Sequence, residues 1–187
     1  MARYVFRVRL LPNPRLGFDP DEAVWRDLAV DGTHTLAAFH EAIFQAFDRH
    51  ERHTYEFLPR DEDGIAVRSY VDPHLYDGGP SWRAMDDEEI DRVIERAVPD
   101  DVSEAAKSRF RDRQSEPPRE GSAADTTIDD LEPDRLGSLS YTFDMGDTWE
   151  HHIECQRTRE GSLDCDPVVL DEQGAAPPQY PDPDDEP

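Results

Sequence analysis

Apolar and polar positions alternate in three places within the N-terminal third of the chain, which is the pattern of half-buried β-strands. The segments are 4–11 (YVFRVRLL), 24–30 (VWRDLAV) and 53–58 (HTYEFL). One face of the first segment carries Tyr4, Phe6, Val8 and Leu10. We expect these three strands to share one sheet.

A helix is predicted over 35–47, between the second and third strands. Its apolar stripe consists of Leu36, Phe39, Ile43 and Phe47, with His40 beside it. Thr33 or Thr35 can cap its N-terminus. The resulting β-β-α-β order resembles that of a β-grasp fold.

Residues 68–123 interrupt the strand pattern and are predicted to form a helical insertion. A helix is expected over 86–98, where Asp86 and Glu89 have the spacing of a capping box. A second, mostly polar helix is expected over 101–113. An alternative is a partner-binding helix or coiled coil, although no heptad repeat is sustained.

Apart from the segment 143–154, the C-terminal part of the chain has a sequence pattern that predicts little further regular structure. A short helical turn is predicted at 128–131 and a short strand at 168–170. Residues 171–187 are acidic and Pro-rich, so we expect a loosely ordered or disordered tail. The chain would then be a single domain over 1–170, with the insertion at about 68–123, followed by the tail.

The segment 143–154, FDMGDTWEHHIE, is the densest in specific chemistry and predicts a β-hairpin. A two-residue Gly-Asp loop would place Phe143 opposite Glu150, an apolar side chain against a charged one. A three-residue loop over 145–147 instead pairs Phe143 with Trp149 and produces one apolar face. We prefer this second register, although three-residue loops usually place glycine last.

That register decides which side chains of the hairpin are buried. Tyr141 would pair with His151, and Leu139 with Ile153. The inward side chains of the second strand would be Trp149, His151 and Ile153. The outward ones would be Glu150, His152 and Glu154.

The charge composition indicates the environment in which the protein works. Acidic residues outnumber basic ones 44 to 20, the formal net charge is −24, and Lys107 is the one lysine. Molar salt shortens the Debye length to roughly 3 Å, which screens the repulsion among so many carboxylates. We interpret the chain as salt-adapted. The alternatives are a nucleic-acid mimic or a cation-binding surface, and direct binding of DNA or RNA is disfavoured because it needs a basic face.

Cysteine use and hydropathy indicate a cytoplasmic location. Cys155 and Cys165 form neither a CxxC pair nor a disulfide framework. The N-terminus lacks the apolar region of a signal peptide, and no apolar run has the roughly 18 residues of a membrane span. We therefore expect a soluble, reduced protein of the cytoplasm.

Histidines and carboxylates gather at the hairpin and the third strand. The candidate site residues are His53, Asp144, Asp147, Glu150 and His151. Such side chains suit Zn, Mn or Fe, or acid–base chemistry, but no fixed ligand spacing such as HExxH accompanies them. A structural interpretation competes: His151 would be an inward histidine bonded to Tyr141 or to the backbone, and Asp144 and Asp147 would hold the turn. We favour the structural interpretation, and the sequence identifies no metal or cofactor.

Several segments resemble the plasmid pRiA4b ORF-3-like family. FDMGDTWEHHIE is similar to its YDFGDxWEHxI signature, and TLAAFHEAIFQAF to its TLxxLHxxI helix. YVFRVRLL and VWRDLAV resemble its first two strands, and ADTTIDDL the segment before its hairpin. HTYEF resembles its HLHEF strand with Tyr55 in place of a histidine, and VVLDEQGAAPP its LDGxxACPPED tail with Ala176 in place of a cysteine.

The resemblance covers residues 4–67 and 124–180 and implies an α+β fold. It also implies an association with plasmids, and with transposon resolvases for some members. Recombination would need a basic face and a nucleophilic serine arrangement, and neither is evident in this sequence.

Together these features predict an α+β fold, with a mixed or antiparallel sheet of about four to five strands, one main packed helix and the helical insertion. Our first hypothesis is a non-catalytic binding or interaction module with an unknown protein or small-molecule partner. Its working surface would be the cleft between the hairpin and the strand at 53–57. The alternative is a metal-dependent or acid–base enzyme that uses the same cleft.

Transfer from molar salt to about 0.1 M salt should lower the melting temperature, because the Debye length grows to roughly 10 Å and carboxylate repulsion is no longer screened. Calorimetry over a series of NaCl concentrations at constant pH measures this effect. A melting temperature that does not depend on salt would contradict the salt-adapted interpretation.

Overall fold

The computed structural model describes residues 2–61, 64, 66, 68–72, 74, 86–97, 104–105, 107–108, 111, 120–163 and 165–181. The strands are β1 (Ala2–Leu10), β2 (Val24–Asp31), β3 (Tyr55–Arg60), β4 (Ser69–Val71), β5 (Glu120–Ser122), β6 (Ser138–Phe143), β7 (Trp149–Glu160) and β8 (Val168–Gln173). The helices are α1 (Leu36–Ala46) and α2 (Asp87–Ala97), with 3₁₀ turns η1 (Pro14–Leu16), η2 (Asp129–Leu131) and η3 (Pro133–Arg135).

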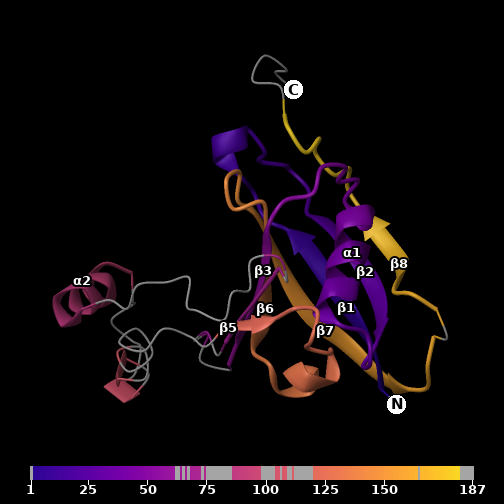
Figure 1. Ribbon diagram of the computed structural model, residues 1–187. Coiled ribbons are helices and arrows are strands. Elements are labelled where there is room, and N and C mark those ends of the chain that lie inside the picture. Colours follow the sequence, from indigo (N-terminus) through magenta and orange to yellow (C-terminus); the bar gives the residue numbers. More distant parts are fainter. Residues whose placement is uncertain are drawn as a thin grey trace.

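All the strands belong to one mixed sheet, in the order β5-β4-β3-β6-β7-β1-β2-β8 (Figure 1). β4 and β5 are parallel, and the other neighbours are antiparallel. β1, β2 and β3 correspond to the three alternating segments of the sequence, and β8 begins at the strand predicted from residue 168.

The predicted fold class is wrong in its central feature, the size of the sheet. In the described residues, eight strands with a few short helices replace the expected four to five strands around one main packed helix. The β-β-α-β order is present as β1, β2, α1 and β3, but as part of this larger sheet. β4 and β5 have three residues each, which is too short for alternation to be visible in the sequence. Both lie within 68–123, so that interval supplies two strands at one end of the sheet as well as a helix.

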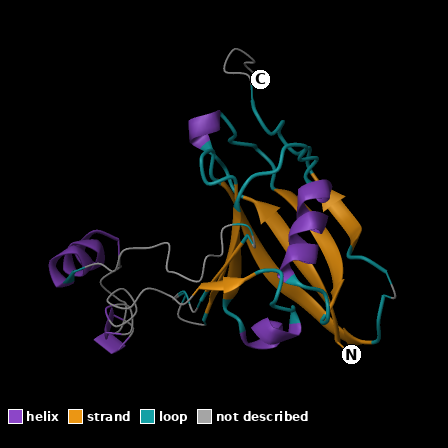
Figure 2. Ribbon diagram, viewed as in Figure 1, coloured by secondary structure: helices purple, strands orange, loops and turns teal. Residues whose placement is uncertain are grey.

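α1 covers one face of the sheet (Figure 2) and closes the main core. Its cap is Thr35, whose side chain accepts a hydrogen bond from the Ala38 amide at 3.1 Å. Phe39 lies fully buried between Phe57, with ring centroids 5.8 Å apart, and Phe6, at 5.2 Å. Burial of each such ring contributes about 1.5–3 kcal/mol, so the helix is held by its apolar stripe.

α2 begins at the predicted capping box. The Glu89 amide donates to Asp86 Oδ1 at 2.9 Å, and the Asp86 amide donates to Glu89 Oε2 at 3.2 Å. The helix lies apart from the sheet (Figure 1), and Arg111 contacts its Asp91. The second helix predicted over 101–113 falls mostly outside the described residues.

The expectation of a loosely ordered or disordered tail is wrong for residues 171–181. β8 continues to Gln173 and pairs with β2. The C-terminal segment, residues 174–181, then crosses the end of α1, and its Gln179 is only 1% exposed. Residues 182–187 lie outside the described part of the chain.

Gln179 fixes the C-terminal segment because its side-chain amide bonds backbone groups of residues 50 and 51, as another backbone segment would. Its Oε1 accepts from the amides of His50 at 2.9 Å and Glu51 at 3.0 Å, and its Nε2 donates to the Glu51 carbonyl at 2.8 Å. Its own carbonyl accepts from the indole of Trp149 at 3.2 Å. The segment therefore joins α1 to the hairpin.

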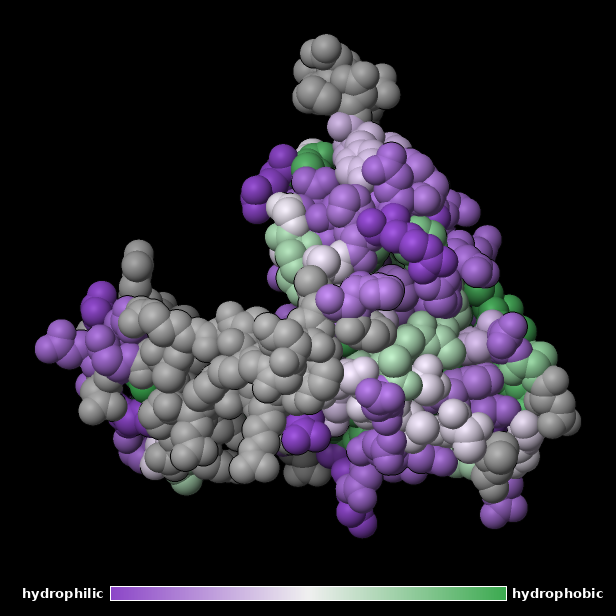
Figure 3. All heavy atoms as spheres, in the orientation of Figure 1, coloured by the Kyte–Doolittle hydropathy of each residue, from purple (hydrophilic) through white to green (hydrophobic). Residues whose placement is uncertain are grey.

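Hydrophilic side chains cover most of the coloured surface that Figure 3 shows. This agrees with the charge balance of the sequence.

Substituting Gln179→Ala should lower the free energy of unfolding by about 1–3 kcal/mol, because buried amide groups lose their partners. Urea unfolding in molar salt measures the change. Gln156→Ala is the matched control on exposed β7, and a change within about 0.5 kcal/mol is expected there. Equal losses in the two variants would refute this role for Gln179.

Candidate functional site

The hairpin of β6 and β7 adopts the predicted register. Phe143 pairs with Trp149, Tyr141 with His151, and Leu139 with Ile153. The turn closes through the Thr148 amide, which donates to the Asp144 carbonyl at 2.6 Å. The prediction is therefore confirmed for the pairing of the strands.

Gly146 is not one of the residues of this turn that have a left-handed backbone conformation. Asp144 and Thr148 each have φ near 58°. Aspartate tolerates this conformation because its short side chain bonds locally. Asp144 Oδ1 accepts from the amides of Gly146 at 2.9 Å and Asp147 at 3.3 Å. Asp144 thus holds the turn, as the structural interpretation predicts.

Asp147 contributes to the turn through its backbone. Its carbonyl accepts from the side chain of Asn13 at 2.8 Å. Among the described residues, its carboxylate has no hydrogen bond of the kind expected for holding the turn. Burial raises the pKa of the Tyr180 phenol, and the charges of Glu51, Asp144 and Asp147 add to this effect, so Asp147 lies within electrostatic reach of Tyr180.

His53 lies beside Asp144, before β3. Its Nε2 is 2.6 Å from the hydroxyl of Tyr180 and 3.6 Å from Asp144 Oδ2. The Tyr180 hydroxyl donates to Glu51 Oε2 at 3.0 Å. A hydroxyl that gives its proton to Glu51 accepts from His53, so imidazole, phenol and carboxylate form one chain of hydrogen bonds.

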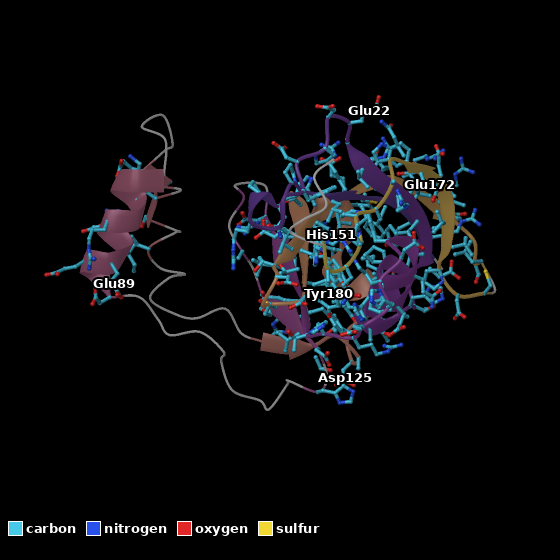
Figure 4. All side chains as sticks on the ribbon, turned by 90° about the horizontal axis from the view of Figure 1, so that it is seen from above. Glu22, Glu89, Asp125, His151, Glu172 and Tyr180 are labelled. Atoms are coloured by element: carbon cyan, nitrogen blue, oxygen red, sulfur yellow. The ribbon has the colours of Figure 1, made fainter. Side chains whose placement is uncertain are left out.

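Glu150 and His151 lie away from this network. Glu150 is exposed on the outward face of β7. His151 lies among the crowded side chains of the sheet region (Figure 4) and is 2% exposed. Its ring centroid is 4.9 Å from that of Phe47 and 5.2 Å from that of Tyr141. Its Nδ1 faces the Trp149 carbonyl at 3.2 Å, which is the backbone bond expected for a structural histidine. Burial lowers the pKa of His151 to about 3, and the charge of Arg49 adds to this effect.

The five candidate residues therefore divide. His53 and Asp144 come together, Asp147 lies in the same turn, and the other two point elsewhere. In the described part of the chain, no three His, Cys, Asp or Glu side chains have the arrangement of a metal site.

Sequence reasoning missed two residues of this region. Tyr180 was assigned to a disordered tail, although VVLDEQGAAPP resembles a family segment and so signalled that the domain continues. His40 was placed at the edge of the helical stripe, yet it is 4% exposed. Its Nδ1 is 2.7 Å from the Tyr141 hydroxyl, and its ring stacks on Tyr55 at 3.7 Å.

Both members of the His40–Tyr141 hydrogen bond are neutral. Burial lowers the pKa of His40 to about 4 and raises that of the Tyr141 phenol well above its usual value. Tyr55, which stands where the family pattern has histidine, supplies the flat partner for the imidazole.

A pocket of about 630 Å³ opens beside His53. Its walls include His40, Glu41, Arg52, His53, Tyr55 and Asp72, and we call it the His53 pocket. Nη1 and Nη2 of Arg52 donate to the two carboxylate oxygens of Glu41, and the distance from Nη2 to Oε2 is 3.0 Å. Asp72 Oδ1 accepts from the His74 amide at 2.8 Å. The pocket thus joins α1, β3 and the end of β4.

Stability should decrease with acidification from pH 6.5 to 5. His40 and His151 have folded-state pKa values of about 4 and about 3, whereas the unfolded value is 6.5. The unfolded chain therefore binds more protons in this window, and the free energy of unfolding falls by up to about 1.4 kcal/mol per pH unit for each histidine.

Urea unfolding across this pH range measures the loss, and NMR of labelled histidine rings assigns it. Both rings should stay neutral in the native protein down to pH 5. A native-state midpoint near 6.5 for either ring would show that it is not desolvated as the structure places it.

None of the helices in the described part of the chain has the length and apolar character that a bilayer crossing requires.

Among solved structures, a protein of unknown function from Methanosarcina mazei Go1 has a similar fold, with a TM-score of 0.56 at 16% sequence identity. The alignment covers 95% of this chain and 73% of that one. Among curated proteins there is no match. The family described as "Plasmid pRiA4b ORF-3-like protein" matches residues 17–180, which is most of the sequence, and the chain therefore belongs to this family.

Proposed function

We propose that this chain is a non-catalytic binding module whose working surface is the His53 pocket and the adjoining hairpin turn. The observation that carries the proposal is that three of the acid and base side chains in the pocket wall are bonded to other side chains of the protein. His40 is bonded to Tyr141, Glu41 to Arg52, and His53 to Tyr180. A general base must accept a proton from the substrate, and these bonds favour a fixed role in the wall for the three groups.

The size of the pocket suits a small molecule or one side chain of a partner. Binding sites for small ligands span about 300–1,000 Å³, and the His53 pocket falls in this range. The stacked rings of His40 and Tyr55 stiffen one wall. Preorganised walls of this kind lower the entropic cost of binding.

The charge of the pocket favours a ligand with a cationic or N–H donor group. Arg52 neutralises Glu41, whereas the hydrogen bond that the carboxylate of Asp72 accepts from the described residues comes from a backbone N–H. Molar salt screens the net charge of −24 beyond roughly 3 Å, so the preference for a cation comes from direct contact with Asp72. We therefore propose an amine-bearing ligand, bound in a salt-rich cytoplasm.

A matched pair of probes tests this proposal: 4-phenylbutylamine and 4-phenylbutyrate share a skeleton and differ in charge. Saturable binding of the amine is expected in ligand-observed NMR, and Asp72→Asn should abolish it. Asp171→Asn is the control, because Asp171 is exposed on β8, at the opposite edge of the sheet from β4. Preference for the carboxylate, or binding of neither compound, contradicts the proposal.

The alternative, a metal-dependent or acid–base enzyme, draws support from the 3.6 Å approach of His53 to Asp144. Elemental analysis of protein purified in molar salt separates the two. The binding module predicts Zn, Mn and Fe far below one ion per chain. A stoichiometric metal that is lost in His53→Ala, and kept in the outward-facing His152→Ala, would favour the enzyme.

A further inference from the structure

Arg49 is a buried cation to which no carboxylate of the described residues is hydrogen-bonded. The residue is 6% exposed, and its Nη1 donates to the Pro177 carbonyl at 3.0 Å. Its Nε and Nη2 are buried and have no hydrogen-bond partner among the described residues. The guanidinium lies over the ring of Trp149, with Cζ 4.4 Å from the ring centroid.

An unpaired guanidinium is unexpected in a chain with 44 acidic residues and 20 basic ones. Arg7 shows the usual arrangement: its Nε and Nη2 each donate to Asp27 at 2.8 Å, one to each carboxylate oxygen. The same two nitrogens are the ones left free in Arg49. Burial lowers the pKa of Arg49 to about 10, so the group is charged at neutral pH. A buried charge without a counter-charge is costly, and a ligand that supplies one is favoured.

His151 supplies a second unpartnered atom in the same region. Its Nε2 is buried without a partner in the described part of the chain. Its Nδ1 faces the Trp149 carbonyl, so the proton is on Nδ1 and Nε2 is an acceptor. Trp149 thus links the two groups, since it stacks on Arg49 and lies two residues from His151 on the same face of β7. The effect of Arg49 on the pKa of His151 places them within electrostatic reach.

We propose that the free edge of the Arg49 guanidinium, formed by Nε and Nη2, binds a small planar oxyanion of the carboxylate class. Two parallel N–H donors match the two oxygens of such an anion, as they do in the Arg7–Asp27 pair. Within this class we choose bicarbonate, because it carries a hydroxyl donor of the kind that the unpartnered His151 Nε2 lacks. This site is separate from the His53 pocket and does not rest on the function proposed for it.

The C-terminal segment closes this site. Pro177 accepts from Arg49, and the carbonyl of Gln179 accepts from the indole of Trp149. The anion therefore enters when the segment lifts, and bound anion holds the segment down. The guest must be small, because Arg49 and His151 are almost fully enclosed.

Titration of the ¹⁵N-labelled protein with sodium bicarbonate, then with sodium formate, tests the proposal. NaCl is exchanged for each salt so that sodium concentration stays constant. We expect a saturable shift of the Arg49 Nε–H resonance, at lower concentration for bicarbonate than for formate. The Nε–H of Arg52 is the internal control, because this side chain is exposed and its Nη1 and Nη2 groups are already paired with Glu41.

Thermal unfolding in the same salts gives a second readout. Bicarbonate should raise the melting temperature of the native sequence and of Arg52→Gln, but not of Arg49→Gln or Arg49→Lys, which lose the two-pronged edge. If the Arg49 variants fail to fold, the resonance titration of the native chain still decides.

The proposal is overturned if chloride, formate and bicarbonate shift the Arg49 resonance alike without saturation. It is equally overturned if a crystal grown in bicarbonate contains only water at Nε and Nη2. Planar density that accepts from both nitrogens would support it.

Discussion

The structure depends most on the cross-strand register that sets Phe143 opposite Trp149. The register fixes which alternate side chains of β7 enter the core, because a slip of one residue would turn all of them outward. Trp149 and His151 are buried as a result. Once Trp149 faces inward, it can receive the carbonyl of Gln179 and the guanidinium of Arg49. The attachment of the C-terminal segment thus follows from a turn far away in sequence.

The same register explains why a segment so dense in polar chemistry does not form one reactive cluster. Adjacent residues of a strand point to opposite faces, so His151 and His152 cannot serve one centre. Asp144 is used by the turn, and His53 bonds to Tyr180. What remains open to a ligand is the wall of the His53 pocket, with Asp72 as its accessible carboxylate. This division supports recognition over reaction as the task of the surface.

The sequence predicts those parts of the fold in which the hydrophobic pattern is long enough to be read. The strands of β1, β2 and β3, helix α1, the capping box of α2 and the hairpin register all follow from periodicity and cap chemistry. The short strands β4 and β5 could not be found, because three residues carry no period and β5 pairs with a segment distant in the chain. Six strands remain without them, so they explain part of the difference from the predicted four to five.

Side-chain partners are harder to predict than elements. Nothing local marks Gln179 as buried, since a Pro-rich acidic stretch is typical of disorder and its order here comes from contacts with residues 50, 51 and 149. The same applies to His40, whose partners Tyr55 and Tyr141 belong to other strands. Of the candidate site, the turn role of Asp144 followed from local turn chemistry, whereas the contact between His53 and Tyr180 needed the whole fold.

The most direct test of this account compares the two adjacent histidines of the hairpin by urea unfolding in molar salt. His151→Ala removes a ring packed against Phe47 and Tyr141 and should lower the free energy of unfolding by about 2 kcal/mol or more. His152→Ala changes an outward side chain and should stay within about 0.5 kcal/mol. Comparable losses, or a larger loss for His152→Ala, would contradict the register on which the core, the C-terminal segment and both proposed sites depend.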